Sequence, residues 1–416
     1  MRQEEDEVEA KAEAGPSRHA VVFIFITLLI DNMGVGLILP VMPDLVAELT
    51  GGSYGQAALW GGYLTFSFAL MQFLFQPVVG NLSDRFGRRP ILIVSLIVLT
   101  VDYVIMGLAP TITVLFVGRV IAGIASSNHS TASAFMADIS PPEKRAQNFG
   151  LLGAAFGLGF ILGPAIGGLV GEISTRAPFY AAAGLAFINL IYGYFVLPET
   201  LGRENRRAFS WRRANPLGTA LQILKLPTVK WLLLTFFLFN LAHFVYPAIW
   251  AYFSKEAFSW SSTEVGISLA LVGFGFALVQ GVLMRRLVPW LGEVKLTAIG
   301  FTTSVIGLLA ISFVTEGWMV YALIPLMVIG GVLNPALTGL MSNQVSNDQQ
   351  GELQGAISSL SAITMLITPL VATQLFGYFT EAVEGRPYFP GAPFLASGLL
   401  MMLALLPFII GIRRSR

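Results

Sequence analysis

The sequence predicts an all-α membrane protein of twelve transmembrane helices, arranged as two pseudo-symmetric bundles of six. Three observations predict this fold class. Hydrophobic residues make up 55% of the 416 residues and charged residues only 12%, and the mean hydropathy is +0.72, far from the balance of a soluble domain. The apolar residues gather in runs of about 20, the length of a helix that crosses a bilayer. The two halves of the chain also resemble each other.

The apolar runs give the expected transmembrane helices in order. They cover residues 20–42, 57–80, 91–109, 112–134, 148–171, 178–197, 230–253, 263–286, 294–314, 317–343, 353–377 and 390–412. The longest polar segment, 198–229, separates six runs from six, and we expect a cytoplasmic linker with helical stretches there. The expected domains are a disordered cytosolic tail, two bundles around this linker and a cytosolic end, at 1–19, 20–197, 230–412 and 413–416. The tail is acidic and polar, so no cleaved signal peptide is expected.

An internal repeat supports the division into two bundles. The segment FALMQF, Phe68 to Phe73, recurs 208 residues later as FALVQG, Phe276 to Gly281. At an offset of 205, Pro164 matches Pro369 and Gly150 matches Gly355. Duplicated six-helix units are a transporter architecture, in which the substrate site lies between the halves near the membrane midplane.

The lysines and arginines between the spans predict the orientation. If the N-terminus is inside, all of them fall in inside segments except Arg176, Lys255 and Arg386. The positive-inside rule therefore places both termini in the cytoplasm.

Three charged residues, Asp31, Asp102 and Arg119, fall inside the expected spans of the first half. Asp31 and Asp102 each lie about eleven residues into a span, roughly 17 Å from its cytoplasmic end. The turn at Pro110 brings Arg119 to the depth of Asp102, so these two are candidates for an ion pair. An ionised side chain at the membrane centre costs roughly 2.5–3.5 kcal/mol on insertion scales, and such residues mark an ion pathway by default. The alternative is a buried pair that only fixes packing.

The segment GNLSDRFGRRP, Gly80 to Pro90, is the most specific motif of the chain. Its glycines permit a tight turn, while Asp84 and the arginines can clamp helix ends and one another. A basic loop that only sets topology is the plain alternative. This loop between the second and third spans resembles the hallmark of the major facilitator superfamily, and the resemblance covers nearly the whole chain.

A second motif, GFILGPAIGG at Gly159 to Gly168, is similar to the signature of drug/proton antiporters. Together with DNMGVGLILPVMP, VDYVIMG and VGRVIAGI it resembles the tetracycline/proton antiporter family. This resemblance implies a bacterial inner membrane as the location. The glycines recur every four residues, which predicts a smooth face for close helix contact, and Pro164 bends the helix. The resemblance implies that this face seals the path against proton leak. The signature residues are Gly159, Gly163, Pro164, Gly167 and Gly168.

The resemblance implies roles for further residues. Asp31, Asp102 and Arg119 match the residues of proton coupling. Ser83, Asp84, Arg85 and Arg88 match the cytoplasmic gating loop. We assign Gly80, Gly87 and Arg89 of the same segment to this gate as well, although for Arg89 alone a role in setting topology is favoured. We add Asp138 to this gate, because it should lie beside the loop arginines at the end of the fourth span; helix-end solvation is the alternative.

The second half departs from the tetracycline exporters. They carry a histidine in the eighth span and an aspartate in the ninth, where this chain has Phe276 and either Thr302 or Thr303. These residues offer an apolar face and weak hydroxyl partners, so the departures predict a largely apolar, weakly cationic amphiphile as cargo. Phe244 and Phe274 add aromatic surface if they face the cavity. The candidates for the substrate cavity are Asn32, Gln72, His243, Tyr246, Trp250, Phe276 and Asn334.

Two histidines keep open interpretations. His243 lies near the pseudo-symmetric counterpart of Asp31, where it either titrates or packs as a neutral residue. His129 lies closer to the cytoplasmic end of its span, and a structural role is favoured.

Composition and motifs exclude several classes of function. The chain has no cysteine, which excludes disulfides and thiolate metal sites; we expect no metal, no cofactor and no nucleic-acid partner. No GxxxxGK[ST] segment or catalytic constellation is present, so we expect neither an ATP-driven pump nor an enzyme. The leading hypothesis is a proton-coupled exporter, driven by the proton gradient and working as one chain. Uptake or exchange of a metabolite, and a membrane sensor or scaffold that transports nothing, are the alternatives.

Overall fold

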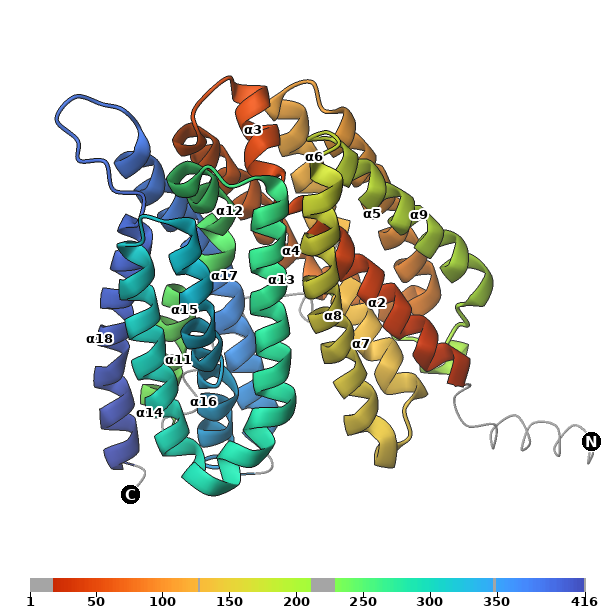
Figure 1. Ribbon diagram of the computed structural model, residues 1–416. Helices are drawn as coiled ribbons and strands as arrows, with labels where there is room; N and C mark the ends of the chain where they lie inside the picture. The colour runs from red at the N-terminus through yellow and green to blue at the C-terminus, as the bar shows by residue number, and fades with distance from the viewer. Residues whose placement is uncertain (1–17, 126–127, 211–228, 347–348, 415–416) are drawn as a thin grey trace, which may run out of the picture.

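The computed structural model describes residues 18–125, 128–210, 229–346 and 349–414, and within these ranges the secondary structure is helical without a strand. Two groups of helices stand side by side (Figure 1). The first described helix begins and the last one ends at the same end of the molecule, which we name the terminal end. The opposite end, which carries the short helix α3, is the distal end (Figure 1).

The first bundle is built from six spans. Its helices are α2 (Arg18–Ile38), α4 (Tyr54–Phe86), α5 (Arg88–Leu108), α6 (Ile112–Ala125) continued by α7 (Asn128–Ile139), α8 (Arg145–Gly171) and α9 (Ala177–Val196). The distal helix α3 (Met42–Thr50) connects α2 to α4, and the 3₁₀ turns η1 (Pro142–Lys144) and η2 (Arg203–Asn205) lie near the terminal end.

The second bundle also contains six spans. They are α11 (Lys230–His243) continued by α12 (Val245–Phe258), α13 (Ser262–Leu278) with the π-helical turn η4 (Val279–Leu283), α14 (Met284–Ser312), α15 (Gly317–Gly330) continued by α16 (Leu333–Ser342), α17 (Gln350–Thr380) and α18 (Ala392–Arg414).

The number of spans agrees with the sequence. Eleven helical stretches of the described residues are long and apolar enough to cross a membrane, and one of them, Ser262–Ser312, has 51 residues. At 1.5 Å per residue, such a stretch is about twice as long as a bilayer is thick. It bends back at Gly292, where φ is 74° and ψ is 160°, a conformation that favours glycine. This stretch therefore forms the eighth and ninth spans, and the prediction of twelve is confirmed.

The predicted tail 1–19 and linker 198–229 fall largely outside the described residues, at 1–17 and 211–228. Their assignment, and with it the exact division into domains, stays a prediction.

Two spans of the second bundle are interrupted near their middle, each four residues before a proline. The break between α11 and α12 lies directly after His243, at Phe244, and Pro247 has no N–H to donate to the His243 carbonyl. The break between α15 and α16 lies at Gly331 and Val332, and Pro335 withholds the N–H that the Gly331 carbonyl would accept. A missing hydrogen bond and the ring clash of proline end a helix in this way. Interrupted helices of this kind commonly line transporter binding sites.

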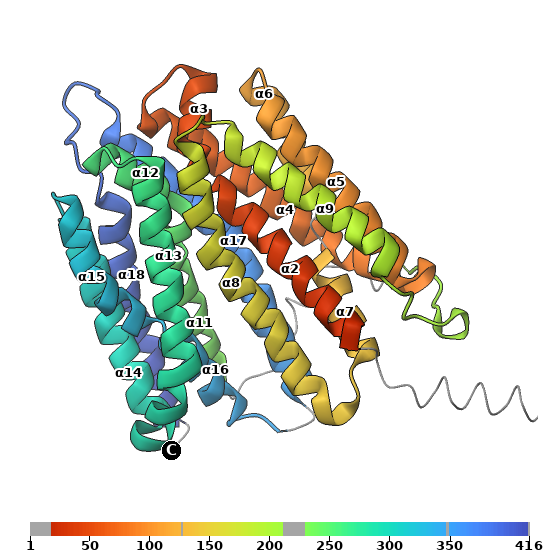
Figure 2. The same ribbon diagram turned by 45° about the vertical axis from the view of Figure 1, so that its right-hand side comes forward.

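The bundles meet at the distal end and diverge toward the terminal end (Figures 1 and 2). Distally, α8 packs on α13 and α4 packs on α17: a Cβ on Gly168 would lie 2.5 Å from the Ser262 carbonyl oxygen, and one on Gly55 would lie 2.6 Å from Thr380 Oγ1. Toward the terminal end, a Cβ on Gly150 or Gly153 of α8 would meet no described atom within 4 Å. The structure is therefore the conformation that is closed at the distal end.

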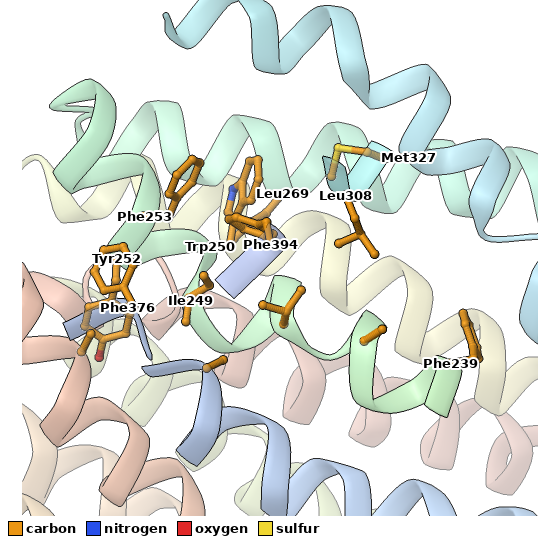
Figure 3. Packing of buried hydrophobic residues seen from close by; sticks show 14 of the residues in the cluster. Phe239, Ile249, Trp250, Tyr252, Phe253, Leu269, Leu308, Met327, Phe376 and Phe394 are labelled. Atoms are coloured by element: carbon orange, nitrogen blue, oxygen red, sulfur yellow. The ribbon is translucent and has the colours of Figure 1, made fainter. Parts of the chain in front are cut away.

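The interior and the outer surface have the composition expected in lipid. Figure 3 shows part of the second bundle's core, in which Trp250, Phe253 and Phe394 pack together, with 4.9 Å between the ring centroids of Phe253 and Phe394. The outer face is also apolar: Phe195 is 78% exposed and Leu169 61% exposed. Helices that are apolar both toward the core and on the outer surface are typical of a multi-pass membrane protein.

Candidate functional site

The predicted ion pair between Asp102 and Arg119 is confirmed. Arg119 Nη2 donates to Asp102 Oδ2 at 3.0 Å, from α6 to the neighbouring antiparallel α5. Asp102 is 1% exposed and the Arg119 side chain 13% exposed. Phe68 of α4 lies under the guanidinium, with 4.5 Å from Arg119 Cζ to the ring centroid, and adds a cation–π contact. Three helices of the first bundle thus surround one buried charge pair.

The pair is incompletely hydrogen-bonded. Asp102 Oδ1 and Arg119 Nε have no hydrogen-bond partner among the described residues. Gly118 leaves space beside the free oxygen, since a Cβ there would lie 3.1 Å from Asp102 Oδ1. A buried polar atom without a partner costs about 1–3 kcal/mol. The arrangement leaves one carboxylate oxygen available for a proton or another donor.

Asp31 has a polar partner that sequence reasoning missed. Asn189 of α9 is fully buried and donates from Nδ2 to the Thr27 carbonyl at 3.3 Å and to Asp31 Oδ1 at 3.4 Å. Asn189 Oδ1 accepts from Thr27 Oγ1 at 3.2 Å. The signal was available, because Asn189 is the one amide side chain in the apolar sequence of α9, and buried polar residues in spans are functional candidates.

Arg88 is the centre of the predicted gate. Its Nη1 donates to Ser83 Oγ at 2.7 Å and to Asp84 Oδ1 at 2.6 Å, and its Nε donates to Asp138 Oδ2 at 3.1 Å. The loop turns at Gly87, where φ is 105°. Arg88 is only 8% exposed, so its guanidinium donates its hydrogen bonds to buried protein acceptors and not to water. The expected ion pair between Asp138 and the loop is confirmed.

The other loop residues lie apart from this cluster. Arg85 lies over the ring of its neighbour Phe86, and Arg89 Nη2 donates to the Tyr194 carbonyl at 2.7 Å. A Cβ on Gly80 would lie 3.7 Å from Ser130 Oγ of α7. The seven predicted loop residues therefore divide into a cluster around Arg88 and residues that position the loop.

The beginning of the linker is docked on the gate loop. Glu199 Oε1 accepts the backbone N–H of Arg88 at 2.9 Å, at the otherwise unsatisfied start of α5. The Arg207 N–H donates to the Asp84 carbonyl at 3.0 Å, and Thr200 Oγ1 donates to Asp138 Oδ2 at 3.2 Å. Sequence reasoning treated this segment as a connection and missed these contacts.

The glycine face of α8 makes the close contact that its spacing predicts. A Cβ on Gly159 would lie 2.6 Å from Asn32 Cβ, one on Gly163 would lie 2.7 Å from Gly36 Cα, and one on Gly167 would overlap the Leu37 carbonyl, all on α2. The Pro164 carbonyl and Gly168 lie against Gly266 and Ser262 of α13 in the other bundle, whereas the Pro164 ring lies against Gly36 of α2. Only glycine permits backbones to approach this closely. The same signature therefore joins α8 to its own bundle and to the second one.

Aromatic side chains gather at the two helix breaks of the second bundle. The imidazole of His243 stacks on Phe239, with 5.4 Å between the ring centroids, and lies 5.7 Å from the Tyr246 ring and 6.3 Å from the Phe276 ring. Phe276 reaches the other break, since a Cβ on Gly331 would lie 2.6 Å from its Cδ1. Three of the predicted cavity residues, His243, Tyr246 and Phe276, are thus brought together.

The remaining cavity candidates are Trp250, whose ring centroid lies 6.4 Å from that of Tyr246, and three residues of other helices. Trp250 is only 3% exposed, and its Nε1 donates to Ser268 Oγ at 2.9 Å, so in this conformation it is a packing residue. Asn32 Nδ2 donates to the Leu28 carbonyl of its own helix at 2.6 Å. Gln72 is half-buried in α4 and Asn334 is exposed in α16. Their role in binding stays a prediction.

The aromatic surface and hydroxyls suggested for the second half are only partly realised. Phe274 is 61% exposed, and Phe244 lies at the first helix break. Thr302 Oγ1 and Thr303 Oγ1 donate to the carbonyls of Ala298 and Ile299 in their own helix, each at 3.0 Å. Neither hydroxyl supplies the negative charge of the aspartate that the tetracycline exporters carry in the ninth span. The side chain of His129 lies outside the described part of the chain.

The comparison with protein families decides the class. The model of the Major Facilitator Superfamily matches residues 24–369. The chain belongs to this superfamily. As a member of the major facilitator superfamily, it is a membrane transporter rather than an enzyme, and both the predicted resemblance and the fold class are confirmed.

Three relatives of this major facilitator chain are informative. It is 38% identical to the tetracycline resistance protein, class C, of Escherichia coli, over 90% of this chain and 94% of the relative. It is 27% identical to multidrug resistance protein 2 of Bacillus subtilis, over 92% and 93% of the two chains. The crystal structure of a human organic anion transporter matches with a TM-score of 0.68 and 25% identity, over 94% of this chain and 99% of the other.

Proposed function

We propose that this chain is a proton-coupled exporter of a small amphipathic compound, a drug or a tetracycline-like molecule, and that it works by alternating access. It exchanges protons for its cargo across a bacterial inner membrane, as one chain, with both termini in the cytoplasm. The names of the relatives support drug export. The lysine and arginine distribution supports the orientation.

The observation that carries this proposal is the Asp102–Arg119 pair. A carboxylate that is 1% exposed in a membrane span is costly unless it is paired or protonated. Its second oxygen has no described partner and can take a proton. Protonation neutralises Asp102, weakens its attraction for Arg119, and changes which packing of α5 and α6 is favoured. Proton binding is thereby linked to the balance between two conformations.

Asp31 provides a second carboxylate in the same bundle, held by Asn189 through a hydrogen bond of 3.4 Å. With the terminal end in the cytoplasm, the structure corresponds to the inward-open state. A cytoplasmic drug enters between the diverging bundles, and protons that arrive from outside reach the acids after the bundles rearrange. In this scheme each carboxylate binds a proton in one part of the cycle and a cationic cargo in the other.

The helix breaks of the second bundle are the proposed cargo site. The ring centroids of Tyr246 and Phe276 lie 5.7 Å and 6.3 Å from that of His243. Interrupted spans also leave backbone carbonyls for polar groups of a ligand. This chemistry fits an apolar, weakly cationic amphiphile, with Asp31 or Asp102 as counter-ion.

Everted membrane vesicles test the proposal. A proton gradient is established, candidate drugs are added, and proton release is followed with a pH-sensitive dye. The expected result is drug-dependent proton flux in wild type and none in Asp102→Asn. Cargo movement without proton movement would favour metabolite uptake or exchange, and absence of flux with every compound that binds would favour a sensor.

A further inference from the structure

A buried lysine lies at the distal end, in the contact between the two bundles, which we name the distal seam. The side chain of Lys255, in the last turn of α12, is only 3% exposed, and its Nζ lies 2.8 Å from Asp44 Oδ2 on α3. Ser262, the first residue of α13, joins the same group: its hydroxyl accepts from Lys255 Nζ at 3.1 Å and donates to Asp44 Oδ2 at 3.2 Å. Asp44 belongs to the first bundle, and Lys255 and Ser262 belong to the second.

Further contacts hold the acid in place. Tyr54, at the start of α4, donates from its hydroxyl to Asp44 Oδ1 at 2.9 Å. Asp44 is in the first turn of α3, where the helix dipole favours a negative charge. Both carboxylate oxygens are therefore bonded, and Asp44 is oriented by its own bundle before it meets Lys255.

A second contact crosses the seam beside this group. Glu172, just after α8, accepts the backbone N–H of Thr263 at 3.1 Å through Oε1. That N–H is one of the unsatisfied donors at the start of α13, so the first bundle caps a helix of the second. The hydrogen bond from Thr263 holds the pKa of Glu172 below its usual range.

The burial of Lys255 gives these contacts energetic weight. An exposed ion pair contributes little, whereas removal of one partner from a buried pair leaves an uncompensated charge. When the distal end opens, α3 must part from α12 and α13, and Lys255 must exchange Asp44 for water.

We propose that Asp44, Lys255 and Ser262 form a distal latch that closes the transporter on the side away from its termini and must break in every transport cycle. The proposal rests on the proposed function only for its alternating-access cycle. It adds a transport-determining charge pair outside the acids and the gate loop described above. Loss of Asp44 affects the latch more than loss of Lys255, because Lys255 remains buried, whereas the side chain of Asp44 is 24% exposed and keeps Tyr54.

Distances between spin labels measure the latch directly. The chain has no cysteine, so no native cysteine has to be replaced before pairs of cysteines are introduced for labelling. Gln56→Cys with Trp318→Cys reports the distal separation of the bundles, and Phe149→Cys with Trp290→Cys reports the terminal separation. In Asp44→Asn we expect the ratio of distally open to distally closed populations to rise about tenfold or more, with a smaller rise in Lys255→Met. The terminal distances should shorten in parallel.

Matched variants separate the latch from a general loss of charge. Glu48→Gln breaks the neighbouring ion pair with Arg176, 2.9 Å between Nη2 and Oε1, which joins two elements of the first bundle only; this variant should leave both distances unchanged. The exchange Asp44→Lys with Lys255→Asp should restore part of the closed population. If Asp44→Asn does not fold, Lys255→Met and Ser262→Ala carry the same test.

The outcomes distinguish the latch from the proposed function. Unchanged distal distances in both Asp44→Asn and Lys255→Met would overturn the latch, even if the wild type exports drugs. A shift of the distal population with no drug-dependent proton flux in the wild type would support the latch and overturn the export proposal.

Discussion

Arg119 Nη2 lies 3.0 Å from Asp102 Oδ2, and the other oxygen of Asp102 has no hydrogen-bond partner among the described residues. The pair is thus satisfied in charge and unsatisfied in hydrogen bonding. A purely structural pair would gain from completing its bonds, and the free oxygen is the position at which the proposed function places the proton.

The first prediction concerns this pair. Asp102→Asn should reduce drug-dependent proton flux to background and lower the free energy of unfolding by about 3 kcal/mol, because it leaves Arg119 buried without a counter-charge. The double variant Asp102→Asn with Arg119→Gln should recover most of the stability but no flux. Thermal unfolding in detergent and vesicle flux measure the two effects. Flux in the double variant would show that the pair only fixes packing.

The second prediction tests Asn189 as a positioning residue for Asp31. Asn189→Ala should destabilise the protein by about 1–3 kcal/mol, since it leaves buried partners unpaired, and should also change the pH profile of transport. Thr27→Val removes the hydroxyl bond to Asn189 but leaves Asp31 its donor, so its profile should stay that of wild type. A stability loss in Asn189→Ala with an unchanged profile would assign Asn189 to packing alone.

The third prediction concerns the gate loop. Asp84→Asn should slow turnover about tenfold, equivalent to about 1.4 kcal/mol, because it removes a charged anchor of Arg88 while leaving the cargo site intact. Cargo binding, measured by fluorescence or calorimetry, should remain within a factor of two. Arg203→Gln, an exposed linker change outside the Arg88 cluster, serves as the control. Wild-type turnover in Asp84→Asn at normal expression would remove the loop from the cycle.

The fourth prediction uses two glycines of α8. Gly167→Ala should cost about 1–3 kcal/mol, the usual penalty of overpacking, because the new Cβ would overlap the Leu37 carbonyl. Gly157→Ala should be neutral or stabilising, since a Cβ there meets no described atom within 4 Å and alanine favours the helix. Thermal unfolding compares them. Equal effects would show that the glycine spacing does not set the contact between α8 and α2.

The fifth prediction concerns cargo. Phe276 and the self-bonded Thr302 and Thr303 offer no charged partner to a rigid polar ligand, whose unpaired groups would cost roughly 1–3 kcal/mol each. Expression in a drug-sensitive host should therefore raise resistance to lipophilic cations more than resistance to tetracycline, as measured by minimal inhibitory concentrations. Strong tetracycline resistance that requires the proton gradient and is lost in Asp31→Asn would contradict this view of the second half.

Local sequence was sufficient for the features that depend on one segment and its solvent. Apolar runs must become helices in lipid because the backbone has no other hydrogen-bond partner there, so the twelve spans were predictable. The antiparallel hairpin of α5 and α6 fixed the depth of Arg119 relative to Asp102. The four-residue spacing of Gly159, Gly163 and Gly167 predicted their close contact, because that spacing places them on one face of a helix.

Tertiary structure decided everything that joins distant segments. Asn189 reaches Asp31 across 158 positions, and Ser262 reaches Asp44 across 218; no periodicity or loop length relates such residues. Lys255 was counted in the sequence as one of the few positive residues of the outer loops, yet it is buried. A residue's position along the chain determines its depth in the membrane, whereas its partners depend on how the helices rotate and pack, and packing is a property of the whole bundle.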